Sequence, residues 1–131
     1  PLARNYGWVD FGMFHVLKNK EASKQKLMRL AEYPYPEDYI AFPGCCAIKE
    51  IYSSIVNDHI IWRFCGGFFI VSESLVEKYY SIIMHYLEEY ILGGRLTWEV
   101  NIWAVVELIH KVRFGWYLAD HNDTIIDIPL L

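Results

Sequence analysis

Three polar positions, far apart in the sequence, carry side chains that could take part in chemistry. Asp10 ends a short apolar stretch at an Asp-Phe-Gly turn, and in open α/β sheets ligands bind outside the carboxyl ends of the strands. Glu99 lies in the expected first turn of a helix, where the helix dipole stabilises a carboxylate. The run from Asp120 to Asp123 follows a later strand and offers ligands for a metal or a phosphate. Asp10 and this run could equally be turn residues bonded to their own backbone, and Glu99 could serve only the helix start.

A glycine pair, Gly66 and Gly67, precedes the most apolar stretch of the chain, Phe68 to Val71. The run of aromatic and β-branched residues predicts a strand buried on both faces. Glycines at its entrance either allow a bend with positive φ or let another group approach the backbone closely. The first use is structural and the second is functional, and the sequence leaves both open.

Two helices are expected after this strand. Ser74 and Glu77 have the spacing of a capping box, which predicts a helix from Leu75 that ends at the glycines 93 and 94. Thr97 is the expected N-cap of the next helix, which would begin at Trp98 and place Glu99 in its first turn.

The remaining pattern completes an α/β domain over residues 1–131, with a mixed sheet flanked by helices. The 68–71 strand should be central, and the 75–91 helix should pack across it through Tyr79, Ile83, Tyr86 and Leu87. A lysine-rich surface helix is expected over 19–31 and a proline-rich loop over 33–39. Further expected elements are strands at 6–9, 40–42, 114–118 and 125–128 and a helix over 46–56.

The composition excludes several classes of protein. The chain has 131 residues, is 54% hydrophobic and has a net charge of −4, so it should form a core and lacks the basic surface of a nucleic-acid-binding protein. Three cysteines, two of them adjacent, fit buried thiols in a reducing compartment better than a disulfide framework. No apolar run approaches the ~20 residues of a membrane span. We therefore expect a cytoplasmic protein without a transmembrane segment, free or peripherally bound at the membrane surface.

Four segments together carry a resemblance to a known family. They are Trp8 to Gly12, Trp62 to Ile70, Thr97 to Trp103, and Ala119 to Asn122. In their order along the chain and in their amino-acid sequences, these segments resemble the HtrL/YibB family, whose members are associated with bacterial surface-polysaccharide genes. More distantly, the layout is similar to the metal-dependent glycosyltransferases of GT-A type, and it would correspond to the C-terminal part of that fold.

The resemblance implies a role for each candidate residue. Asp10 and His121, with Asp120 beside it, would hold a divalent metal, Mn²⁺ or Mg²⁺, on the diphosphate of a nucleotide-sugar donor. Glu99 would face the donor sugar or the acceptor hydroxyl, as a positioning group or general base. The residues implied in donor binding are Gly66, Gly67, Trp98 and Asn101.

The implied activity is transfer of a sugar from a nucleotide-sugar donor to a surface polysaccharide or another glycan acceptor. Gly12 stands where the family motif has a second acid, and little of the chain precedes Asp10 to form a nucleotide-binding βαβ portion. Either that portion is missing from the sequence, or the analogy is imperfect. A binding or scaffolding domain that keeps the fold without turnover is the alternative. A metal-dependent hydrolase using Asp10, Asp120 and His121 is disfavoured because no metallohydrolase spacing occurs.

Overall fold

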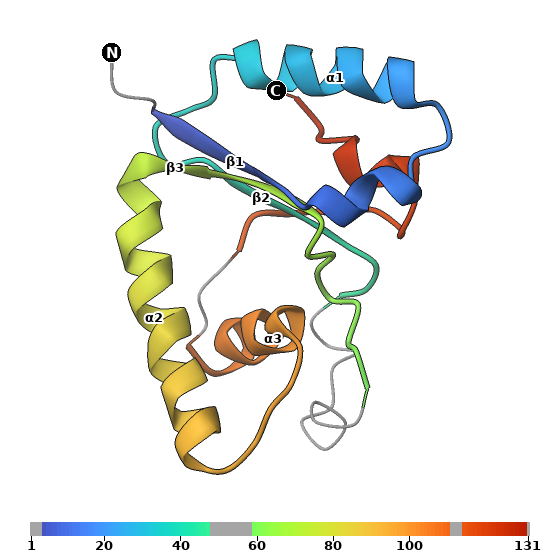
Figure 1. Cartoon of the computed structure of the whole chain (residues 1–131). Coiled ribbons are helices and arrows are strands. Elements are labelled where there is room, and N and C mark those ends of the chain that lie inside the picture. Colours follow the sequence, from blue (N-terminus) through green and yellow to red (C-terminus); the bar gives the residue numbers. More distant parts are fainter. Residues whose placement is uncertain (1–3, 48–58, 111–113, 131) are drawn as a thin grey trace.

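A mixed sheet of four strands organises the described part of the chain. The computed structural model describes residues 4–47, 59–110 and 114–130. The strands are β1 (Asn5–Val9), β2 (Ile40–Gly44), β3 (Phe68–Ser72) and β4 (Trp116–Leu118). Their order is β1-β3-β2-β4, with β3 antiparallel to both of its neighbours and β2 parallel to β4 (Figure 1). The predicted α/β class and the interior position of β3 are therefore confirmed.

Helices cover both faces of this sheet. Helix α1 (Lys20–Glu32) lies over one face together with the C-terminal segment, whereas α2 (Glu73–Leu92) and α3 (Glu99–His110) lie on the other (Figure 1). Two short 3-10 helices complete the described elements, η1 (Phe11–His15) directly after β1 and η4 (Asp123–Ile126) after β4. The chain thus forms three layers, helix, sheet and helices.

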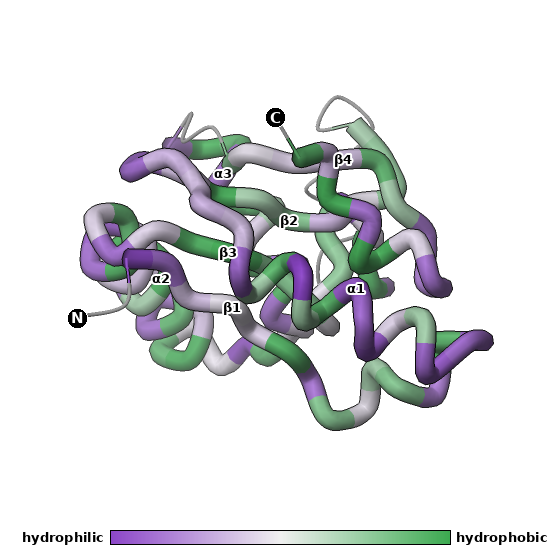
Figure 2. The backbone as a smooth tube through the Cα atoms, turned by 90° about the horizontal axis from the view of Figure 1, so that it is seen from above, coloured by the Kyte–Doolittle hydropathy of each residue, from purple (hydrophilic) through white to green (hydrophobic). Residues whose placement is uncertain are grey.

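Strand β3 contributes to a hydrophobic core on each face of the sheet. Because side chains alternate along a strand, Phe68 and Ile70 join the core beneath α1 and η4, whereas Phe69 packs against the core formed with α2 and α3. Figure 2 shows β3 as hydrophobic along its length, as expected for an interior strand covered on both sides.

A buried ion pair fixes α3 to the segment that precedes β3. The Arg63 guanidinium donates to both carboxylate oxygens of Glu107 at 2.7 and 2.8 Å, and Arg63 is only 1% exposed. A third bond runs from Arg63 to the carbonyl of Cys46 at 2.9 Å. The guanidinium also lies over the rings of Phe64 and Trp116. Fork geometry and stacking on aromatic rings are what make arginine suitable for such a site.

The start of α2 differs from the prediction. The helix begins at Glu73, two residues earlier than expected, because β3 runs into it without a loop and Ser72 is both the last strand residue and the N-cap. Ser74 is therefore inside the helix, and its hydroxyl contacts the Glu37 carbonyl at 3.0 Å and the Asp38 carboxylate at 2.8 Å. The predicted capping box is wrong, whereas the predicted end at Gly93 is confirmed.

Other expectations have mixed outcomes. The surface helix, the strands at 6–9 and 40–42 and a strand within 114–118 are confirmed, and α3 begins at Glu99, one residue after Trp98. The expected strand at 125–128 is wrong, since residues 123–126 form η4. Most of the expected helix over 46–56 lies outside the described residues. None of the described helices has the length and apolar character needed to span a membrane.

Candidate functional site

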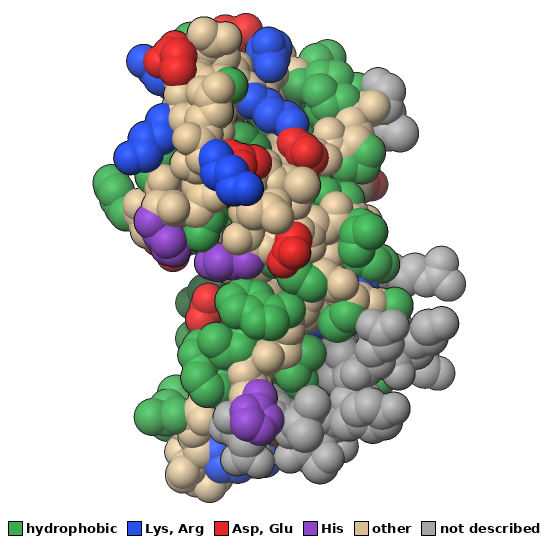
Figure 3. All heavy atoms as spheres, turned by 90° about the vertical axis from the view of Figure 1, so that its right-hand side faces the viewer, with side chains coloured by type: hydrophobic (Ala, Val, Ile, Leu, Met, Phe, Trp, Pro, Cys, Tyr) green, Lys and Arg blue, Asp and Glu red, His purple; other side chains and the backbone are tan. Residues whose placement is uncertain are grey.

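A cleft opens where η1, the segment before β3, the start of α3 and the segment after β4 meet. Its volume is about 170 Å³, smaller than the ~300–1,000 Å³ of typical ligand pockets, so a large ligand would extend beyond it. Figure 3 shows this side of the molecule, with histidine side chains at mid-height above a hollow bordered by an acidic side chain and hydrophobic groups. The cleft is lined by Asp10, Gly12, Met13, His15, Val16, Ile60, Trp62, Gly66, Gly67, Trp98, Glu99, Val100, His121 and Ile125.

Asp10 lies at the junction of β1 and η1. Its backbone N–H donates to the Gly67 carbonyl at 2.9 Å, which extends the pairing of β1 with β3 by one residue. Its carboxylate accepts from the Gly12 N–H at 2.6 Å and so caps η1. The expected turn role is therefore real, and the exposed carboxylate also lies in the cleft.

The structure decides between the two uses of the glycine pair. Among the described glycines, only Gly94 has a positive φ, so Gly66 and Gly67 do not serve a left-handed bend. A Cβ atom at Gly66 would lie 2.6 Å from Oε1 of Glu99 and 3.1 Å from Cγ1 of Val100. A Cβ atom at Gly67 would lie 3.3 Å from Cδ1 of Ile125. The pair is glycine because the first turn of α3 and η4 approach its backbone closely.

Glu99 reaches the cleft from the first turn of α3. The position is favourable for a carboxylate because the helix N-terminus carries a partial positive charge. Its side chain is exposed and directed at the backbone of Gly66. The helix-start role and a role in the cleft are therefore compatible.

His121 forms the opposite wall with two aromatic neighbours. Its ring centroid lies 5.1 Å from that of Trp62 and 6.1 Å from that of His15. The His15 ring is held in turn by a contact of Nδ1 with the Gly12 carbonyl. Trp62 and Trp98 are 39% and 42% exposed, so two indoles offer flat apolar surface to the cleft.

Two of the predicted site residues lie outside the lining. Asn101 is fully buried, and its amide bonds the Ile61 N–H at 2.7 Å and the His59 carbonyl at 2.8 Å. It thereby fixes the segment leading to Trp62 against α3. The Asp120 carboxylate accepts from the His121 N–H at 2.7 Å and orders the turn that carries this histidine. Both residues therefore hold in place the segments that carry cleft residues, Asn101 the one with Trp62 and Asp120 the one with His121.

No family model, no curated protein and no solved structure matches the chain.

Metal binding is limited by the number of ligands in the cleft. Within residues 4–47, 59–110 and 114–130, no three His, Cys, Asp or Glu side chains are grouped so that they could hold a metal ion. Asp10 and His121 nevertheless line the same cleft and could supply one ligand each. With one carboxylate and one imidazole, an ion bound there would complete its shell with substrate phosphates and water. The imidazole favours a transition-metal ion over Mg²⁺.

Two of the three cysteines, Cys45 and Cys65, lie in contact in surroundings that disfavour the thiolate. The Cys45 and Cys65 sulfurs lie 3.7 Å apart as free thiols, and Cys65 is fully buried. Burial raises the pKa of both thiols above the ordinary value, so the reactive thiolate is scarce at neutral pH. The expectation of buried thiols is confirmed for Cys65.

Sequence reasoning missed Trp62 as a cleft residue, and it gave His15, just beyond Asp10, only as a possible second polar group that is more often packed or solvated. Trp62 begins one of the four segments that carry the resemblance, so its position in that motif was the available signal. His15 ends η1, five residues after Asp10, and the 3-10 conformation of this segment brings its ring next to that of His121.

Proposed function

We propose that the cleft binds the sugar-diphosphate end of a nucleotide-sugar donor and that the protein is a glycosyltransferase-like enzyme. One observation carries the proposal: Asp10, Glu99 and His121, which belong to three distant parts of the chain, line one cleft with a glycine pair between them. Convergence of polar groups in one concave site is the usual mark of a binding or catalytic centre. The glycan acceptor, including a role in polysaccharide biosynthesis, and the cytoplasmic location rest on the sequence alone.

Each group has a role that follows from its chemistry. The indoles of Trp62 and Trp98 would pack against the apolar face of the sugar ring. Gly66 would leave room for the Glu99 carboxylate, which would then face the sugar ring across the cleft. Glu99, at a helix N-terminus beside Gly66, would accept a hydrogen bond from a sugar or acceptor hydroxyl and could remove its proton.

Asp10 and His121 would face the diphosphate. A divalent metal bound there would neutralise the charge that develops on the leaving diphosphate. His15 lies next to His121 and would add a hydrogen-bond donor on the same side. Asp120 would act through the turn that orients His121 rather than as a ligand.

A binding domain without turnover is the second candidate. Gly12 occupies the place of a second acid, and a Cβ atom there would lie 3.2 Å from Oδ1 of Asp10. A second carboxylate could therefore be placed beside the first only after a small shift of Asp10. With one acid at this turn, the cleft could hold a donor or a glycan while lacking the charge needed to activate it.

Release of nucleoside diphosphate distinguishes the two candidates. The chain is incubated with Mn²⁺ and a panel of nucleotide sugars, with and without glycan acceptors, and the diphosphate is quantified. The enzyme proposal expects release above the protein-free rate, loss of release in Asp10→Asn and His121→Ala, and unchanged release in the surface control Glu88→Gln. Binding of a donor by calorimetry without any release would instead support the binding domain.

A further inference from the structure

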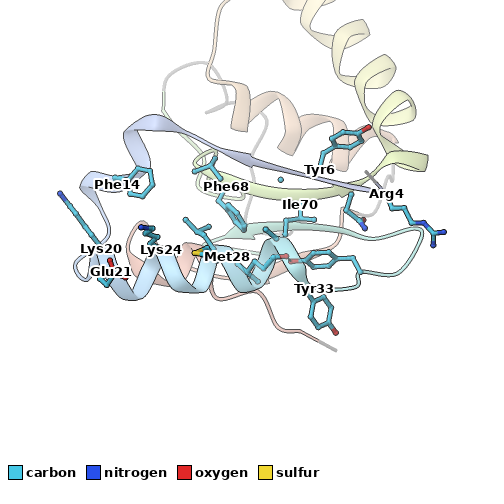
Figure 4. A pocket seen from close by; sticks show the side chains of 17 residues that line it. Arg4, Tyr6, Phe14, Lys20, Glu21, Lys24, Met28, Tyr33, Phe68 and Ile70 are labelled. Carbon is cyan, nitrogen blue, oxygen red and sulfur yellow. The ribbon is translucent and has the colours of Figure 1, made fainter. Parts of the chain in front are cut away.

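A second and larger cavity lies on the other side of η1, between β1 and α1. We call it the α1 groove, and its volume is about 1020 Å³. Figure 4 shows its construction: Phe68 and Ile70 of β3 point into it from the sheet, and Met28 faces it from α1. Phe14 of η1 lies at one end and Arg4 at the other.

The wall of the groove is apolar and accessible along its length. Phe68 and Ile70 form its base and are only 2% and 4% exposed, whereas Met28, Phe14 and Val9 along its sides are 56%, 40% and 38% exposed. A volume of this size, spread along a 13-residue helix and lined by exposed apolar side chains, suits a long apolar ligand.

The charged residues of the lining are mostly cationic. They are three bases, Arg4, Lys20 and Lys24, and one acid, Glu21, so the groove is locally positive although the whole chain has a net charge of −4. Figure 4 places Lys20 and Lys24 together at the end of the groove occupied by Phe14. Within the described part of the chain neither lysine forms an ion pair, whereas Lys26 on the same helix is paired with Asp127. Unpaired ammonium groups beside an apolar channel complement an anionic head attached to an alkyl chain.

We propose that the α1 groove binds a single-chain amphiphile with an anionic head, such as an alkyl phosphate or a fatty acid. The alkyl chain would lie between β1 and α1 against the exposed side chains of Val9, Phe14 and Met28, and the head would lie beside Lys20 and Lys24. Burial of the chain supplies the affinity, and the lysines set the orientation. This site does not depend on the proposed transferase activity. It adjoins the cleft, because Phe14 faces the groove while the next residue, His15, lines the cleft.

Isothermal titration of the 131-residue chain with dodecyl phosphate, kept below its micellar concentration, tests the proposal. We expect saturable binding of one molecule per chain, no binding of inorganic phosphate, and weaker binding of neutral dodecyl maltoside. Lys24→Glu should weaken binding by roughly tenfold, which corresponds to about 1.4 kcal/mol. The same charge change at Lys78, an exposed position on α2 outside the groove, should leave binding unchanged.

A groove-filling variant separates the site from non-specific adsorption. Ala31 lines the groove and is exposed, so Ala31→Trp should occupy the channel without disturbing the core and should abolish binding. Equal binding by wild type, Ala31→Trp and Lys24→Glu would overturn the proposal. So would an absence of binding by the wild type, adsorption to anionic vesicles only, or a stable dimer in light scattering whose second copy closes the groove.

Discussion

At the scale of single residues, the contact between Gly66 and Glu99 joins packing to function. The Glu99 carboxylate occupies the space that a side chain at position 66 would need. A residue that looks like a strand-opening glycine is therefore part of what places the acid in the cleft. A glycine that opens a strand and an acid at a helix start can each be predicted from the sequence. Only the structure shows that the glycine makes room for the acid.

Gly66→Ala should destabilise the protein by about 1 kcal/mol, the low end of the cost of overpacking, because the exposed Glu99 carboxylate can rotate away whereas the buried Val100 must shift. Urea unfolding measures the loss. Gly7→Ala is the matched control, since no atom lies within 4 Å of the added methyl group. Equal stability of the two variants would show that α3 can move away from the glycine pair at no cost.

Glu99→Gln separates the two roles of this side chain. The amide keeps the shape and removes the charge, so loss of the helix-dipole interaction should cost only ~0.3–1 kcal/mol. If Glu99 also acts on the acceptor, release of nucleoside diphosphate should fall by about 10²-fold or more while the thermal midpoint changes little. Unchanged release with a lowered midpoint would leave Glu99 as a helix-start residue.

Residue types alone could not show which polar side chains remain available to a ligand. Asp10 and Glu99 were predicted as candidates from strand-end and helix-start positions, and both line the cleft. Asn101 was implied only by the sequence resemblance, and its amide is engaged by backbone groups at His59 and Ile61. Those partners lie about forty residues earlier, so no local pattern could reveal them.

At the scale of elements, the Arg63–Glu107 pair ties α3 to the chain that precedes β3. Breaking a buried pair by removing one partner leaves a buried charge, so Glu107→Gln should lower the free energy of unfolding by roughly 3–5 kcal/mol. The double variant Arg63→Met, Glu107→Leu should recover much of this loss, because no charge remains buried. Denaturant unfolding of both variants checks this. A double variant as unstable as the single one would show that the bonds of Arg63 to Cys46 and the aromatic rings dominate.

Periodicity predicted the elements better than their ends. The apolar repeats correctly indicated α1, α2 and α3, and the β-branched runs indicated the strands. The error at 125–128 arose where local side-chain bonds compete with the strand. The Asn122 side chain accepts from the Thr124 N–H, and the Tyr117 hydroxyl donates to the Ile125 carbonyl, so this backbone turns instead of joining the sheet.

At the scale of the whole molecule, the fold class could be predicted but the topology could not. Alternating helical and strand patterns indicate an α/β fold. They do not state which strand lies beside which, because pairing depends on contacts across the chain. The order β1-β3-β2-β4 brings the ends of β1 and β4 and the entrance of β3 to the same cleft, although β1 and β4 are at opposite edges.

Tyrosines packed in the core between α1 and the sheet should make the free energy of unfolding depend on pH in the alkaline range. Burial raises the pKa of Tyr35 to about 12 and raises that of Tyr117 further above its ordinary value of 10. Both phenols are held in the neutral form, with Tyr35 donating to the Leu30 carbonyl at 2.8 Å and Tyr117 to that of Ile125. In the unfolded chain both would ionise near pH 10. The unfolded state then binds fewer protons than the folded state, and the same holds for the Cys45 and Cys65 thiols, whose pKa is also raised by burial. These groups should make the free energy of unfolding fall as the pH rises from about 9 to 12, with the tyrosine contribution setting in near pH 10.

Chemical denaturation at pH 8, 10 and 11 measures this fall. Tyr117→Phe should be less stable at pH 8, since the Ile125 carbonyl loses its donor, but its stability should decline less between pH 10 and 11 because one ionisable phenol is gone. Tyr80→Phe is the control, because Tyr80 is 62% exposed and its removal should leave the pH dependence as in the wild type. A decline in Tyr117→Phe as steep as that of Tyr80→Phe would mean that Tyr117 ionises freely in the folded protein.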